Sequence, residues 1–152
     1  MSCKATDHNF HVVGHGIKCT KCKSKKVFSN FGFDQRTTWI FTEVSCWLLA
    51  LVLKDKLNAE ICFYRDDDFI YHVAVFYNDN IIDITGIHSI HNFENMCENY
   101  IPKAINGNFS IASEEDIRIL FHHKIRKDET IEDEYDYSLA NECSDKIISK
   151  YL

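Results

Sequence analysis

The 152-residue chain contains one proline and five glycines, which leaves little room for long flexible linkers between its elements. It has no apolar run of the roughly 20 residues that a membrane-spanning helix needs. Its net charge is −6, which argues against a protein that binds along the phosphate backbone of a nucleic acid. The chain does not begin with a basic segment followed by an apolar one, the pattern of a secretory signal. We therefore expect a cytoplasmic protein that does not span a membrane and does not bind nucleic acid.

What the chain does contain is cysteine. It has seven, an odd number, and in a cytoplasmic protein they favour metal binding or thiol chemistry over a framework of disulfides. Three lie near the N-terminus and four are scattered, which suggests two uses of sulfur. Residues 1–26 are polar and rich in Cys, His and Lys, and we expect them to form a module separate from a domain over residues 27–152.

The N-terminal module has a pattern typical of structural zinc sites. Cys19 and Cys22 have the C-x2-C spacing that presents two thiolates to Zn²⁺, and Cys3 and His8 supply two further ligands for a tetrahedral site. This pattern resembles half of a zinc ribbon, which would dock a partner or fold the segment and would take no part in catalysis. A redox role is less favoured because we expect no strand to lead into Cys19, and the remaining reading is a tail of reduced thiols. The alternatives to His8 in the fourth place are His11 and His15.

A helix is predicted in the first part of the larger domain. Residues 27–38 predict irregular structure, and an apolar helix then begins at Thr42 or Ser45, either of which can cap it, and runs to about Leu57. Apolar side chains surround most of this helix, so we expect it to be central and buried.

From residue 59 onward apolar and polar residues alternate, the period of a half-buried strand. We predict three antiparallel strands, with Gly86 stopping the last, followed by helices. A nucleophile-bearing helix packed on an antiparallel sheet, with further helices at the C-terminus, is an α+β fold. The predicted strands are 59–65, 69–77 and 81–85, and the predicted later helices are 92–100, 113–123 and 137–151.

Cys46 is the candidate nucleophile. It lies at the start of the predicted helix, where the unpaired N–H groups and the positive end of the helix dipole lower the pKa of a thiol. An imidazole beside the thiol helps further by forming a thiolate–imidazolium pair, and His72 on the second strand can supply it. Asp83 on the next strand is the candidate that orients the imidazole.

This arrangement depends on the register of one hairpin. If Asn78 and Asp79 form a two-residue turn, Asp83 lies opposite Ala74 and shares a face with His72. A slip of one residue would move Asp83 to the other face of the sheet. His88 and His91 follow closely enough for either to take the place of Asp83.

The segments that carry Cys46, His72 and Asp83 resemble those of known families. Ser45-Cys46-Trp47 followed by an apolar helix is similar to the nucleophile helix of papain-like cysteine proteases. The run from His72 to Asp83 looks like the His hairpin of NlpC-type cell-wall peptidases and the His-to-Asp strand pair of transglutaminase-like folds. The likeness covers residues 42–86. It implies a papain-like fold with Cys46 as nucleophile, His72 as base and Asp83 as orienting group, and no cofactor for catalysis.

Two positions depart from that pattern. Val44 stands where a Gly is usual, and Ile40 stands where the family has a Gln. Gln35 is a weak substitute, so the oxyanion hole would consist mainly of backbone N–H groups, including that of Cys46.

Two functional hypotheses remain, one an enzyme and the other a binding module. The first is an intracellular thiol hydrolase or acyl-transferase that acts on a peptide, isopeptide or glutamine amide through an acyl-enzyme. The second is a non-enzymatic zinc-containing module that binds a protein, in which Cys46 is structural. A chain rich in Lys, Ile and Asn is consistent with a low-GC bacterium or its phage.

Overall fold

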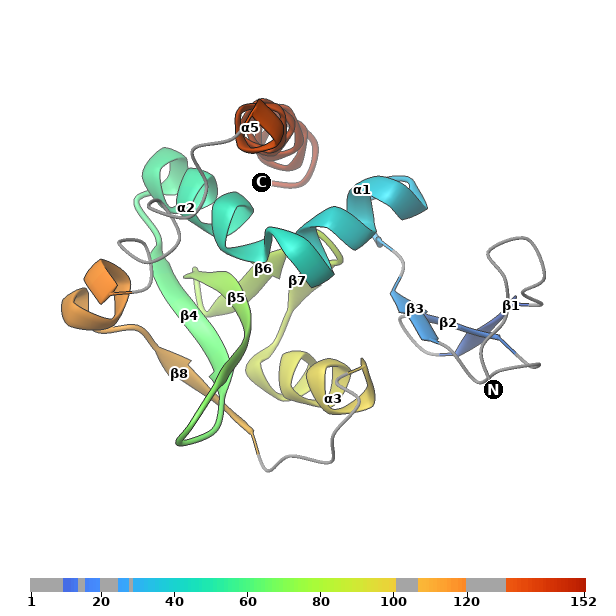
Figure 1. Cartoon of the computed structure of the whole chain (residues 1–152), viewed down its shortest axis with the longest axis horizontal. Helices are drawn as coiled ribbons and strands as arrows, with labels where there is room; N and C mark the ends of the chain where they lie inside the picture. Colours follow the sequence, from blue (N-terminus) through green and yellow to red (C-terminus); the bar gives the residue numbers. More distant parts are fainter. Residues whose placement is uncertain (1–9, 14–15, 20–24, 28, 101–106, 120–130) are drawn as a thin grey trace.

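The computed structural model describes residues 10–13, 16–19, 25–27, 29–100, 107–119 and 131–152 (Figure 1). Its centre is a five-stranded antiparallel sheet in the order β7-β6-β5-β4-β8. The fold is therefore α+β, as the sequence predicts. The strands are β4 (Glu60–Arg65), β5 (Ile70–Tyr77), β6 (Asn80–Asp83), β7 (Gly86–His88) and β8 (Asn108–Ile111).

Helices pack on both faces of this sheet (Figure 1). Residues 114–119 form a further helical segment, which begins at a reciprocal cap between Ser113 and Asp116. The helices are α1 (Gln35–Trp39), the π-helix η1 (Ile40–Val44), α2 (Cys46–Leu57), α3 (Ile90–Tyr100) and α5 (Ile131–Tyr151).

Side-chain alternation along the strands divides the core in two. Val73, Val75 and Ile82 point to the side of α2 and α5, whereas Ala74 and Ile81 point to the side of α3. Each face therefore buries its own apolar cluster, and the His72 and Asp83 side chains described below lie on the α3 face.

The α2 helix is the central buried helix that the sequence predicts. It begins at Cys46, directly after Ser45, so the alternative start at Thr42 is wrong: Thr42 lies in the π-helix η1. It ends at Asn58, whose left-handed backbone (φ 52°) and N–H bond to the Lys54 carbonyl close the last turn. Lys56 ties it to α5 through Ser144 (2.8 Å) and Asp145 (2.7 Å).

Several elements differ from the prediction. Residues 35–38, expected to be irregular, belong to α1, which η1 follows directly, and Asp34 caps α1 through the Thr37 N–H (2.7 Å). The short strands β7 and β8 were not predicted. The last helix begins at Ile131, six residues before the predicted start.

The N-terminal residues contain a separate three-stranded antiparallel sheet of β1 (Phe10–Val13), β2 (Gly16–Cys19) and β3 (Lys25–Val27). The expected module boundary at residue 26 falls inside β3. The expectation that no strand leads into the C-x2-C pattern was wrong, because β2 ends at Cys19.

No single helix in the described part of the chain is both long and apolar enough to cross a membrane. Only the bent pair over residues 35–42 and 46–57, taken together, reaches that length and composition.

Candidate active site

The hairpin between β5 and β6 has the register that the sequence predicts. Asn78 and Asp79 have positive φ angles (49° and 62°), as a two-residue turn with the right twist requires. Tyr77 therefore pairs with Asn80, and Val75 pairs with Ile82. The same register puts residue 83 opposite residue 74, on the face that carries His72.

His72 and Asp83 meet on that face. The Nε2 atom of His72 lies 2.8 Å from Oδ2 of Asp83, and both residues are buried, with exposures of 6% and 3%. Because Nε2 faces the carboxylate, Nε2 carries a proton that it donates to Asp83, and the other ring nitrogen, Nδ1, does not contact this oxygen. Phe93 of α3 packs against the ring, with the two centroids 5.8 Å apart.

Cys46 reaches the same imidazole from the first residue of α2. Its side chain makes a hydrogen bond with His72, so the same imidazole has both the thiol and the carboxylate as partners. Cys46 is half-buried, in contrast to the three other described free cysteines, which are buried. The structure thus brings together the three residues that the sequence selects as nucleophile, base and orienting group.

The charges of the three groups support one another. Burial alone would lower the pKa of His72, but the hydrogen bonds with Asp83 and Cys46 outweigh it and raise that pKa above its ordinary value. Burial alone would raise the pKa of Asp83, and His72 together with His88 holds it far below its ordinary value instead. At neutral pH we therefore expect a His72 imidazolium beside an ionised Asp83 carboxylate.

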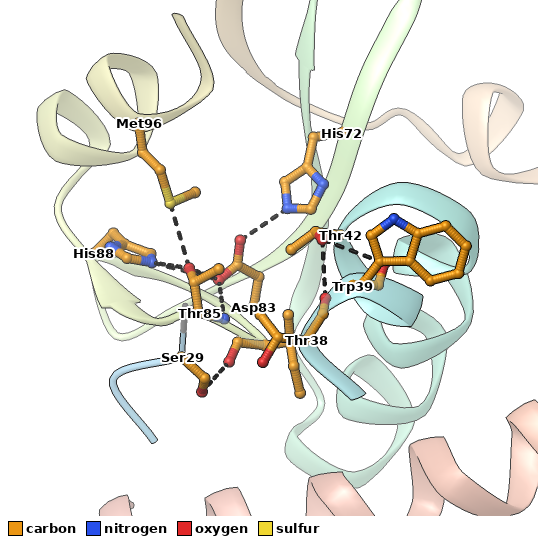
Figure 2. A network of polar contacts seen from close by, with 10 residues as sticks. Ser29, Thr38, Trp39, Thr42, His72, Asp83, Thr85, His88 and Met96 are labelled. Carbon is orange, nitrogen blue, oxygen red and sulfur yellow. Dashed lines mark hydrogen bonds and ion pairs between the residues drawn. The ribbon is translucent and has the colours of Figure 1, made fainter. Parts of the chain in front are cut away.

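The second oxygen of Asp83 is held by residues that follow it in the chain. Oδ1 accepts hydrogen bonds from the Thr85 N–H (2.8 Å) and from the Thr85 hydroxyl. His88 Nε2 lies 2.7 Å from that hydroxyl oxygen and 3.4 Å from Oδ1. Figure 2 shows His72 and His88 reaching the carboxylate from two sides, with Thr85 beside it.

A second tight hairpin creates this arrangement. Asp83 pairs with Gly86 across the turn at residues 84–85, so Gly86 begins strand β7. The prediction that Gly86 stops the sheet was wrong. Gly86 has a φ of 151°, and a Cβ there would lie 3.2 Å from the Cβ of Asn30. The backbone thus needs glycine at this position.

The other described cysteines have a different environment. Burial raises the pKa of Cys62 and of Cys97 far above the ordinary value, and it raises the pKa of Cys143 to about 12. These thiols stay protonated at neutral pH. Only Cys46, among the four free cysteines described, has an imidazole as a hydrogen-bonding partner in the structure.

The remaining sequence-selected residues fall outside this site or outside the described residues. His88 supports Asp83 and does not replace it, and His91 is exposed beside Asn95 (3.1 Å). Gln35 is exposed at the start of α1. Of the metal candidates, Cys19 is described by its backbone alone, at the end of β2, and Cys3, His8 and Cys22 lie outside the described residues.

Sequence reasoning missed the part played by Thr85. The signal was present, because an Asp followed two residues later by an N–H that its carboxylate accepts is a common turn in which the side chain mimics the backbone. Asp83-Ile84-Thr85-Gly86 has this form.

Comparisons with known proteins give one result. The family model described as Phage YunG-like protein matches residues 24–135, a range that includes Cys46, His72, Asp83, Thr85 and His88 and begins after Cys22. No curated protein and no solved structure matches the chain.

Proposed function

The chain belongs to the phage YunG-like protein family, and from the geometry of its site we propose that it is a thiol hydrolase or acyl-transferase of papain-like type. Its substrate would be a peptide, isopeptide or glutamine amide. The observation that carries the proposal is the buried His72 ring, bonded to Asp83 on one edge and to the Cys46 thiol as well.

The chemistry follows from the protonation states. The Cys46 thiolate attacks the carbonyl carbon of an amide and forms a carbon–sulfur bond. The His72 imidazolium gives its proton to the leaving nitrogen as the carbon–nitrogen bond breaks, which leaves an acyl-enzyme and a neutral imidazole. Water or an amine then attacks the acyl group, His72 takes its proton, and the thiolate is released.

Asp83 stabilises and orients His72 during this cycle. It stays ionised because its pKa lies far below the ordinary range, so it stabilises the imidazolium in both steps and fixes the ring by the bond to Nε2. The N-terminal end of α2, where Cys46 lies, favours negative charge on the sulfur and on the oxygen of the tetrahedral intermediate.

The first test is the rate at which iodoacetamide alkylates each cysteine between pH 5 and 9, mapped by peptide mass spectrometry with zinc present to protect the N-terminal thiols. We expect Cys46 to react at pH 6 roughly tenfold faster than an ordinary thiol of pKa about 8.5, because the gain in thiolate exceeds the loss of nucleophilicity. In His72→Ala the midpoint of this profile should move up to about 8.5.

The chain supplies its own controls. The buried Cys62, Cys97 and Cys143 should stay unlabelled in every folded variant, which reports on the fold in the same experiment. His91→Ala removes an exposed imidazole outside the site and should leave the Cys46 profile unchanged. Slow labelling of Cys46 that rises only near pH 8.5 would contradict the proposal and favour the protein-binding module, which predicts a structural thiol.

A positive result leads to turnover. Cys46→Ala and His72→Ala should each abolish hydrolysis of peptide or glutamine-amide substrates while circular dichroism stays unchanged, and activity retained in either variant would discard the mechanism. The zinc knuckle of Cys3, His8, Cys19 and Cys22 stays a prediction, which metal analysis of the purified full chain tests directly.

A further inference from the structure

We infer that Thr85 and His88 are positioning residues that hold the Asp83 carboxylate in the orientation in which it stabilises the His72 imidazolium. This inference rests on the proposed function and deepens it. It assigns a role to a second buried histidine, which the three-residue mechanism leaves unexplained.

The geometry begins with the two oxygens of Asp83. Oδ2 binds His72, and Oδ1 faces away, toward the turn that follows β6. Two donors of Thr85, its backbone N–H and its hydroxyl, bind Oδ1, and His88 approaches from the next strand. Thr85 is fully buried and His88 is 3% exposed, so water does not compete for these bonds.

Counting protons fixes the direction of each bond. An ionised carboxylate only accepts, so the single hydroxyl proton of Thr85 goes to Asp83. The hydroxyl oxygen must then accept from His88 Nε2, which therefore carries a proton. The Met96 sulfur, 3.4 Å from the hydroxyl oxygen, is a weak acceptor and does not compete with the carboxylate.

Donors therefore run from His88 through Thr85 to Oδ1 of Asp83, and the other oxygen of the same carboxylate accepts from His72 (Figure 2). Asp83 is the last residue of β6. His72 binds its Oδ2 while Thr85 and His88 hold its Oδ1, so the two sets of contacts together fix the rotation of the carboxylate. The turn itself is braced from a distant segment, because Ser29 Oγ donates to the Ile84 carbonyl (2.6 Å) and Asn30 N–H donates to the Thr85 carbonyl (2.7 Å).

A purely structural reading of the same bonds makes a different prediction. If Thr85 and His88 only satisfied a buried carboxylate, their loss would lower stability and leave the reactivity of Cys46 in the folded protein unchanged. If they position Asp83, their loss weakens the support of the imidazolium, and the thiolate must then form at higher pH.

The experiment measures the pH profile of Cys46 alkylation in the full-length chain for Thr85→Val, Thr85→Ser and wild type. We expect Thr85→Val to raise the midpoint by about one pH unit, the effect of losing one hydrogen bond to a charged group. Thr85→Ser keeps the hydroxyl and should restore the wild-type midpoint. Thr38→Val is the matched control, because Thr38 is equally buried but its hydroxyl binds the Asp34 carbonyl (2.8 Å) of its own helix.

His88 gives a second pair of variants if Thr85→Val fails to fold. His88→Leu removes the donor and should raise the midpoint, whereas His88→Gln places an N–H donor near the position of Nε2 and should restore much of the wild-type profile. In the wild-type protein, long-range ¹H–¹⁵N spectra should show a proton on His88 Nε2. An unprotonated Nε2 would overturn the inference without any variant.

The outcomes separate the two proposals. Slow labelling of wild-type Cys46 refutes the proposed function, and this inference is refuted with it. Fast labelling in the wild type together with the same midpoint in folded Thr85→Val and His88→Leu refutes the positioning role alone.

Discussion

Replacing Asp83 by Asn tests whether the buried ion pair with His72 stabilises the fold. The substitution keeps the shape of the side chain and removes its charge. Both side chains are buried, and their charged atoms lie 2.8 Å apart. The imidazolium would then lose its carboxylate counter-ion in a place that water does not reach.

The expected loss is large because one charge remains after the other is removed. Removing one partner of a buried pair lowers the free energy of unfolding by about 3–5 kcal/mol, equivalent to a Tm decrease of roughly 6–20 °C for a domain of this size. Urea denaturation at several pH values measures the free energy, and differential scanning calorimetry measures the Tm.

The pH dependence makes the test specific. The pKa of Asp83 is lowered in the folded state, so its contribution is present above the ordinary value of 3.8 and is lost as the pH falls further. The pKa of His72 is raised, so its contribution is complete below the ordinary value of 6.5 and is lost as the pH rises. The difference between wild type and Asp83→Asn should therefore be greatest between about pH 4 and 6.5.

The matched control is Asp145→Asn. Asp145 also makes a 2.7 Å ion pair, with Lys56, but its side chain is 73% exposed, so its loss should change the unfolding free energy by less than about 1 kcal/mol. A difference between wild type and Asp83→Asn that is equally small, or that does not vary with pH, would refute the buried pair.

Two further substitutions test the hairpins. Gly86→Ala should lower the free energy of unfolding by about 1–3 kcal/mol, and Gly32→Ala should lower it by less. Both glycines have positive φ, but only a Cβ added at Gly86 would approach Asn30, at 3.2 Å, whereas a Cβ at Gly32 would have nothing within 4 Å. Equal losses in urea denaturation would argue against the close approach. Asp79→Gly should raise the free energy of unfolding by up to about 1 kcal/mol, because glycine adopts φ 62° without strain, and a decrease would show that the Asp79 side chain stabilises the turn.

The site geometry could be predicted from sequence where local rules determine it. The period-2 pattern located β5 and β6, and Asn78 and Asp79 are residues that accept positive φ, so the turn fixed the register and with it the shared face of His72 and Asp83. The start of α2 was predicted only as one of two alternatives, Thr42 or Ser45, because both are capping residues; the helix follows Ser45, whose side chain makes no capping hydrogen bond. These features depend on a few neighbouring residues.

The missed elements depend on contacts that a local pattern does not contain. The turn at residues 84–85 has an Ile at its first position, which gives no turn signal, so Gly86 was interpreted as the end of the sheet. Strand β8 pairs with β4 across more than forty residues of chain, and its four residues have only partial burial. For α1, the Asp34 cap was visible in the sequence, but β-branched Thr37 and Thr38 reduced the helical signal.

The carboxylate and both imidazoles come from one short stretch of chain, from His72 to His88, that folds as consecutive hairpins. Contacts this local in sequence form early in folding, because little loop entropy is lost when they close. Only the sulfur arrives from another part of the chain. A variant or relative without the cysteine would therefore keep the hydrogen bonds among His72, Asp83, Thr85 and His88. The presence of these hydrogen bonds is thus no evidence by itself that a protein has a reactive thiol.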